Sequence, residues 1–148
     1  MRIFVATIIL SVFVDLYSKF LASDYLINET NLIGDFVFLK LIENPGIAFS
    51  ILMPPIIIKI LTIILIIGIF YYYYTDIRKL NLPLLDVAFG LIIGGAMANG
   101  YERIINEKVI DFIGVKGFSI FNLADSFITI GAIIFVLFSL SHILKKNG

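Results

Sequence analysis

Two aspartates, Asp111 and Asp125, are the residues in this 148-residue chain best suited to chemistry. Both lie between apolar neighbours, within a stretch of residues 109–126 in a strongly apolar sequence. A carboxylate at the centre of a membrane helix costs roughly 2.5–3.5 kcal/mol on insertion scales, so two of them near one membrane surface suggest a shared task. Carboxyl groups held close together share a proton. We therefore hypothesise that they are the acid/base pair of a membrane aspartic peptidase.

Each aspartate also has a plainer interpretation. Asp111 could be a solvated loop acid, and Asp125 could be a helix N-terminal acid stabilised by the helix macrodipole. The chain has no cysteine, which excludes disulfides, thiolate metal sites and a cysteine nucleophile. Its single histidine, His142, lies near the C-terminal end among lysines, which excludes a multi-histidine metal cluster and argues against a Ser/His triad. We expect neither a metal nor a cofactor.

The composition is that of an integral membrane protein. Hydrophobic residues make up 60% of the chain, and the mean hydropathy is +1.05. The formal net charge of +0 gives no electrostatic argument for nucleic-acid binding. Four apolar runs are each long enough to cross a bilayer as a helix, at about residues 3–21, 55–74, 82–101 and 121–144. We therefore predict an all-α membrane protein with four transmembrane helices and a single domain over residues 1–148.

The distribution of basic residues predicts an orientation. The short segments on one side of the membrane carry Arg2, Arg78, Lys79, Lys145 and Lys146, a pattern typical of the cytoplasmic side. Both termini are then cytoplasmic, and the longer segments 22–54 and 102–120 lie outside. Acids and a lysine crowd the region before and around any cleavage site, at Asp15, Lys19 and Asp24, which favours a retained first span over a cleaved signal peptide.

Both outside segments contain extended stretches. Residues 36–42 are rich in β-forming side chains, and Asn44-Pro45-Gly46 follows as a turn. These features predict a small β-rich segment between the first two helices, lying on the outer membrane surface. In the second outside segment, residues 109–113 and 118–121 are candidates for extended structure around Gly114 and Gly117.

Polar residues at helical spacing gather at the outer ends of three spans. The pairs that share a helix face are Asp15 with Lys19, Asn99 with Arg103, and Asn122 with Asp125. In a membrane such groups face protein or water rather than lipid. Because all three pairs lie at one depth, near the outer leaflet, they can converge on a single site.

Some of these features have alternative roles. Asp15 and Lys19 either form a self-neutralising pair that only orients the helix, or they brace an active site. Arg103 could extend to the outer surface instead of the site. The small residues of 94–98 allow close helix packing and need no further role.

Five motifs in chain order resemble those of the lipoprotein signal peptidase (signal peptidase II) family, over essentially the full length. They are Asp15-Leu16-Tyr17-Ser18-Lys19, Asn44-Pro45-Gly46-Ile47-Ala48-Phe49-Ser50, Gly94-Gly95-Ala96-Met97-Ala98-Asn99 with Arg103, Val109-Ile110-Asp111-Phe112, and Phe121-Asn122-Leu123-Ala124-Asp125-Ser126. The chain departs from the family pattern at Ala98, where a Gly is usual, and at Glu102, where an Asp is usual. The connection between Asp111 and Asp125 is also short.

The resemblance implies an aspartic endopeptidase with Asp111 and Asp125 as the catalytic pair. It implies removal of the signal peptide from diacylglyceryl-modified prolipoproteins, just before the lipidated cysteine, at the outer face of the bacterial cytoplasmic (inner) membrane. It also implies inhibition by globomycin-type cyclic peptides. We expect a monomer whose partners are the prolipoprotein substrates and membrane lipid.

The remaining motif residues are expected to support the pair. The amides of Asn44, Asn99 and Asn122 can hydrogen-bond the substrate backbone or orient the aspartates. Arg103 can hold the substrate backbone or the fold near the site. Asp15 and Lys19 can brace the first helix against the outer segment, and Gly46 allows a conformation or a close approach that a side chain would block.

Two other classes of protein stay open on the residues alone. A small proton- or cation-coupled membrane carrier would also contain intramembrane acids paired with basic residues. It should place them near the membrane midplane and show related halves. An assembly or lipid-binding subunit would make both aspartates dispensable.

Overall fold

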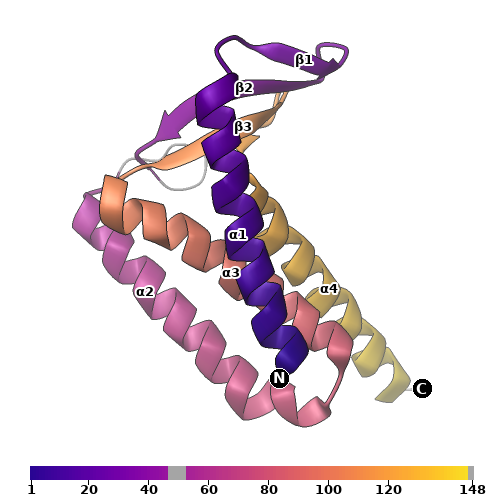
Figure 1. Cartoon of the computed structure of the whole chain (residues 1–148). Coiled ribbons are helices and arrows are strands. Elements are labelled where there is room, and N and C mark those ends of the chain that lie inside the picture. The colour runs from indigo at the N-terminus through magenta and orange to yellow at the C-terminus, as the bar shows by residue number, and fades with distance from the viewer. Residues whose placement is uncertain (47–52, 147–148) are drawn as a thin grey trace.

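The computed structural model of the chain describes residues 1–46 and 53–146, which form four long helices and a small sheet (Figure 1). The helices are α1 (Arg2–Tyr25), α2 (Pro55–Tyr72), α3 (Pro83–Asn106) and α4 (Leu123–Lys146). The strands are β1 (Thr30–Ile33), β2 (Val37–Asn44), β3 (Val109–Val115) and β4 (Ile120–Phe121). All four helices contain a stretch long and apolar enough to cross a membrane. The predicted fold class is confirmed.

Helix α3 is the centre of the bundle. It packs against α1, α2 and α4, whereas α1 and α4 share fewer contacts with each other. Of the span in α3, 67% is buried inside the protein, compared with 22% in α1 and 11% in α2 and α4. The other three helices therefore turn most of their surface to lipid, and α3 can carry side chains that lipid would not tolerate.

Helix α1 is apolar on its outer surface and polar on its inner face. Ser11, Asp15 and Lys19 follow each other at four-residue spacing and are all buried. Between them, Phe13 and Tyr17 are exposed. This arrangement is favourable in a bilayer, because lipid solvates apolar side chains and leaves polar groups to find partners within the protein.

Two adjacent glycines bring the neighbouring helices close to α3. A Cβ on Gly94 would lie 2.7 Å from the Ser11 Cβ on α1. A Cβ on Gly95 would lie 2.5 Å from the carbonyl oxygen of Ala124 on α4. The small-residue stretch predicted from the sequence thus serves close packing, and it determines where the first turn of α4 lies.

Helix α2 continues without a break into η2 (Tyr73–Ile77), a π-helical turn, and η3 (Arg78–Leu80), a 3₁₀ turn. Asn81 adopts the left-handed conformation that ends η3, and Pro83 occupies a position at the start of α3 that needs no backbone N–H. The connection is short, so α2 and α3 are antiparallel neighbours. In Figure 1 this connection lies at the same end of the bundle as both termini.

The sheet covers the opposite end of the bundle, in the antiparallel order β1-β2-β3-β4 (Figure 1). It unites the two segments that the sequence predicted to contain extended stretches, through pairing of β2 with β3. In the register of this pairing, Asn44 lies opposite Val109 and Ile42 lies opposite Asp111. Side chains alternate along a strand, so Asn44 and Asp111 are diagonal neighbours on one face.

Candidate active site

The two aspartates predicted to be catalytic line one cavity at the sheet end of the bundle. Asp111 lies on β3 and is 3% exposed, and Asp125 lies half-buried in the first turn of α4. The cavity has a volume of about 560 Å³, and Asn44, Arg103 and Asn122 also line it. Much of the remaining wall is apolar, with Phe118, Ile120, Phe121, Ile128 and Ile130. The two carboxyl groups therefore face a common space that is large enough for part of a peptide.

Asp125 is held by the N-terminal cap of α4. The side-chain Oδ1 of Asn122 accepts a hydrogen bond from the Asp125 N–H at 2.9 Å, and Asp125 Oδ2 accepts one from the Asn122 N–H at 3.3 Å. This reciprocal arrangement is a capping box, with Asn122 as the N-cap residue and Asp125 as the third helical residue. The interpretation of Asp125 as a helix N-terminal acid is therefore correct, and it is compatible with a place in the cavity.

Both carboxylate oxygens of Asp111 accept hydrogen bonds from side-chain amides. Asn122 Nδ2 donates to Oδ1 at 2.7 Å, and Asn44 Nδ2 donates to Oδ2 at 2.9 Å. Asn44 is itself oriented by the Gly46 N–H, which donates to Asn44 Oδ1 at 2.9 Å. Asp111 is therefore not the solvated loop acid of the plainer interpretation.

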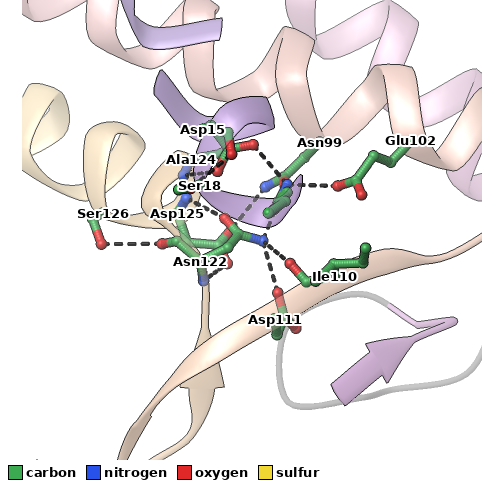
Figure 2. A network of polar contacts seen from close by, with 11 residues as sticks. Asp15, Ser18, Asn99, Glu102, Ile110, Asp111, Asn122, Ala124, Asp125 and Ser126 are labelled. Carbon is green, nitrogen blue, oxygen red and sulfur yellow. Dashed lines mark hydrogen bonds and ion pairs between the residues drawn. The ribbon is translucent and has the colours of Figure 1, made fainter. Parts of the chain in front are cut away.

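Asn99 on α3 joins the cavity to the interior of the bundle (Figure 2). Its Nδ2 donates to Asp125 Oδ1 at 2.8 Å, and its Oδ1 accepts a hydrogen bond from Lys19 Nζ at 2.9 Å. The same Oδ1 lies 3.2 Å from Asn122 Nδ2. Asn99 and Asn122 therefore form an amide bridge between Asp111 and Asp125.

Lys19 is the centre of a buried ionic cluster behind this bridge. Its Nζ lies 2.7 Å from Asp15 Oδ2 and 2.6 Å from Glu102 Oε2, and all three side chains are nearly inaccessible. Asp15 Oδ1 also accepts a hydrogen bond from the Ala124 N–H at 2.7 Å, so a carboxylate on α1 caps α4. The predicted Asp15–Lys19 pair exists, but its partners lie on α3 and α4 rather than on the outer segment, because the pair points into the bundle.

The environment of Asp111 favours its protonated form. Burial raises the pKa of this carboxyl above its ordinary value of 3.8, and the charge of Asp125 raises it further. Hydrogen bonds from Asn44 and Asn122 and the charge of Lys19 oppose the rise but do not cancel it. Burial and a nearby second carboxylate are both causes that raise the pKa of a carboxyl group, and Asp111 has both.

Arg103 lines the cavity with a guanidinium that has spare hydrogen-bonding capacity. Its Nε is buried and has no hydrogen-bond partner among the described residues. Its charge acts on the carboxylates of Asp125, Asp111 and Glu102. The group is therefore held at the cavity by electrostatics and can still donate hydrogen bonds to a molecule bound there.

The structure brings together the whole predicted set of site residues, which comes from five separate motifs of the chain. The set is Asp15, Lys19, Asn44, Gly46, Asn99, Arg103, Asp111, Asn122 and Asp125. The rest of the outer motif, residues 47–50, lies outside the described residues. His142 lies exposed near the far end of α4, where it stacks on Phe138.

Glu102 is the member of the cluster that the sequence did not assign to the site. It follows Asn99 by three residues on α3, so helical spacing alone places the two on one face. The available signal was an acid on the same helix face as Asn99, at the depth at which Lys19 lies on α1. Its partner could not be identified without the packing of α1 on α3.

The model of one protein family, signal peptidase (SPase) II, matches residues 7–141 of the chain. The chain belongs to the signal peptidase II family. It is 38% identical to a lipoprotein signal peptidase of Caldicellulosiruptor bescii over 144 residues, which cover 95% of this chain and 91% of that protein. It is 35% identical to the corresponding protein of Chlorobaculum tepidum over the full length of both.

Solved structures agree with this membership. A bacterial membrane enzyme solved by the in meso method superposes with a TM-score of 0.82 and 28% identity, covering 95% of this chain and 94% of that one. A second such enzyme gives a TM-score of 0.84 at 26% identity. This signal peptidase II family member is therefore a peptidase, and its four apolar helices make it a multi-pass protein of the bacterial inner membrane.

Proposed function

We propose that this signal peptidase II family member is an aspartic endopeptidase that processes diacylglyceryl-modified prolipoproteins. It cleaves before the lipidated cysteine and releases the signal peptide. Asp111 and Asp125 are the catalytic pair. The whole chain acts as one domain, with the sheet and the cavity on the extracytoplasmic side and both termini in the cytoplasm.

The observation that carries this proposal is that both carboxyl groups face one cavity and are joined by amides. Asn122 donates to Asp111 and caps Asp125, while Asn99 donates to Asp125. A pair of carboxyl groups so arranged can hold a single proton between them. A second cavity, between α1, α2 and α3, is lined by apolar and aromatic side chains and by no carboxyl group of the described residues.

The pair supplies both proton transfers of peptide hydrolysis. The ionised carboxylate takes a proton from a water molecule, which attacks the scissile carbonyl carbon. The protonated carboxyl group donates a hydrogen bond to the carbonyl oxygen and then helps to protonate the leaving nitrogen. Because the two groups titrate as a coupled pair, the shared proton is a property of the pair rather than of Asp111 or Asp125 alone.

The cavity wall fits a substrate with a peptide part and a lipid part. Arg103 lines the cavity, and its guanidinium group can donate to a backbone carbonyl of the peptide. The apolar wall formed by Ile128 and Ile130 continues along α4, where Ile130 is 48% exposed on the surface that faces lipid. Acyl chains of a lipidated cysteine can follow this surface. The lipid would then anchor the substrate at the depth of the Asp111–Asp125 pair, the catalytic dyad.

The arrangement of polar groups favours a peptidase over a carrier. A carrier should place its ionisable groups near the membrane midplane, between related halves of the chain. Here the buried side chain of Lys19 contacts those of Asp15 and Glu102, and the buried Asp111 lies on β3 of the sheet. The opposite half of the bundle buries an apolar cluster instead.

Processing of a purified prolipoprotein by the purified protein tests this function. We expect cleavage of the diacylglyceryl-modified form to a mature product with an N-terminal lipidated cysteine, identified by mass spectrometry. The unmodified form should remain uncleaved, and a globomycin-type peptide should inhibit the reaction. Equal cleavage of both forms would contradict the lipid-dependent part of the proposal, and full activity with the inhibitor would count against the family mechanism.

The oligomeric state is tested separately. We propose that the monomer is active, since the described residues of one chain supply the whole set of dyad contacts. The protein should process substrate in nanodiscs that hold a single copy. Activity found only in samples with two or more copies per disc would overturn this part of the proposal.

A further inference from the structure

Three asparagine amides around the dyad share one arrangement. Each side-chain oxygen accepts from a group that can only donate: Asn44 Oδ1 from the Gly46 N–H, Asn122 Oδ1 from the Asp125 N–H, and Asn99 Oδ1 from the Lys19 ammonium. Asn99 Oδ1 has a second, longer contact at 3.2 Å, with Asn122 Nδ2. An amide has its oxygen and its nitrogen at opposite corners, so a fixed oxygen also fixes the direction of the NH₂ group. In all three cases the NH₂ group then faces a carboxylate of the dyad.

We call the group that donates to each asparagine oxygen its anchor. Lys19 differs from the other two anchors. The Gly46 and Asp125 anchors are backbone N–H groups, and the chain provides them at short range. The Asn99 anchor is a side chain 80 residues away, and it is a buried charge that needs the two carboxylates of Asp15 and Glu102 around it. A buried ion of this kind is costly unless it is fully paired. The proposed mechanism assigns it no role.

We propose that Lys19 is a positioning residue for the dyad and that it acts through Asn99. This inference rests on the proposed function of the dyad. Because an ammonium group has three donors and no acceptor, Lys19 keeps Asn99 Oδ1 turned toward itself, and the Asn99 NH₂ group must face Asp125 Oδ1. Asp125 Oδ1 thereby keeps its hydrogen-bond donor, and the Asp125 carboxyl group keeps one orientation in the cavity.

The geometry separates this role from substrate binding. Lys19 is 2% exposed and is not among the described residues that line the cavity, while Asn99 lies between it and Asp125. Loss of Lys19 should therefore lower kcat and leave KM close to the parental value. If Lys19 acts mainly through Asn99, its loss should have little further effect once the Asn99 amide is gone, because only its charge acting on Asp111 remains.

A double-mutant cycle with Lys19→Met and Asn99→Ala tests the proposal, with kcat and KM measured on a diacylglyceryl-modified prolipoprotein. Each single variant should lose kcat on the order of 10-fold, and the double variant should lose little more than Asn99→Ala alone. Lys19→Arg keeps a cation that can only donate and should recover most of the kcat lost in Lys19→Met. Lys40→Met is the matched control, because Lys40 is half-exposed and pairs with Glu29 on the surface. It should keep parental kcat and KM.

Lys19→Met leaves two buried carboxylates without their cation, so its fold must be checked by the unfolding midpoint. If it does not fold, the same cycle is run in a Glu102→Gln background, where one of these carboxylates is neutral. Multiplicative losses in the double variant, or a change in KM instead of kcat, would overturn the proposal. Activity of an Asp125→Asn variant would instead refute the dyad itself, so the two failures are distinguishable.

Discussion

The two ends of the helix bundle bury opposite kinds of side chain, although α1 and α3 contribute to both. The end with the termini has an apolar and aromatic core of Phe4, Tyr73, Ile77, Leu85, Phe89 and Ile93. The sheet end buries Asp15, Lys19, Asn99, Glu102, Asp111 and Asn122. Lipid is as apolar as leucine, so the first core is held by packing and the second by polar contacts that lipid cannot provide. Both ends stabilise the fold, but only the polar end has groups for chemistry.

Removal of one carboxylate from the polar end should have the largest effect on stability. Asp15→Ala leaves Lys19 with one anion fewer and the Ala124 N–H without its partner. Loss of one member of a buried ion pair costs about 3–5 kcal/mol, so we expect a strongly lowered unfolding midpoint and loss of cleavage. In Asp15→Asn an amide oxygen can still accept from Ala124, and the loss should be smaller. Equal midpoints for Asp15→Ala and the parent would show that the cluster does not stabilise the fold.

A change in the spacing of α3 and α4 should have an intermediate effect. In Gly95→Ala the new Cβ would lie 2.5 Å from the Ala124 carbonyl oxygen, so the first turn of α4 must move, and Asp125 moves with it. Overpacking of this kind costs about 1–3 kcal/mol, and we expect cleavage to fall as well.

The control for this change is Gly68→Ala on α2, where the new Cβ would lie more than 4 Å from every described atom outside the nearby backbone of its own helix. Stability and cleavage should stay at the parental level or rise slightly, since alanine favours a helix more than glycine. If the two variants behaved alike, close packing of α3 against α4 would not position Asp125.

A change at the apolar end should affect stability without affecting chemistry. The Tyr73 hydroxyl donates to Asp86 Oδ1 at 2.8 Å, and the ring stacks on Phe4 with centroids 3.8 Å apart. Tyr73→Phe keeps the stacking and loses one hydrogen bond, which costs about 0.5–1.5 kcal/mol. We expect a slightly lower unfolding midpoint with unchanged kcat. A large fall in kcat would show that the two ends are coupled.

The smallest effect concerns the pH dependence of stability. The pKa of Asp111 is raised in the folded protein, so this residue contributes most to stability below its ordinary value of 3.8. The contribution is lost as the pH rises through the folded-state pKa. The side chain in Asp111→Asn cannot ionise. As the pH rises from 3.8 through the folded-state pKa of Asp111, the unfolding midpoint of this variant should therefore fall less than that of the parent. Parallel pH curves for both proteins would contradict the assigned environment of Asp111.

The features that depend on local sequence could be predicted. The length of the apolar runs predicted four helices, and four-residue spacing predicted the Asp15–Lys19 pair. The predicted spans do not give the helix ends: α3 continues to Asn106, beyond the apolar span predicted to end near residue 101. The reason is that Glu102 finds Lys19 inside the bundle, so the helix can remain regular beyond the apolar run.

Contacts between distant segments could not be predicted from local patterns. The hydrogen bond from Asn44 to Asp111 depends on the register of β2 against β3. The hydrogen bond from Ala124 to Asp15 depends on how closely α1 and α4 approach across α3. These two hydrogen bonds are outcomes of tertiary packing, so neither the spacing nor the composition of the sequence contains information about them. The motifs indicated which residues belong to the site, and the structure supplies their partners.

The most direct test of the central claim replaces each catalytic carboxyl group by an amide. Asp111→Asn and Asp125→Asn should each lower the rate of prolipoprotein cleavage on the order of 10²–10⁴-fold, since general acid–base catalysis contributes that much. Both variants should retain a cooperative unfolding transition, which would show that the loss of cleavage reflects the chemistry and not the fold. Cleavage at the parental rate by either folded variant would contradict the assignment of Asp111 and Asp125 as the catalytic pair.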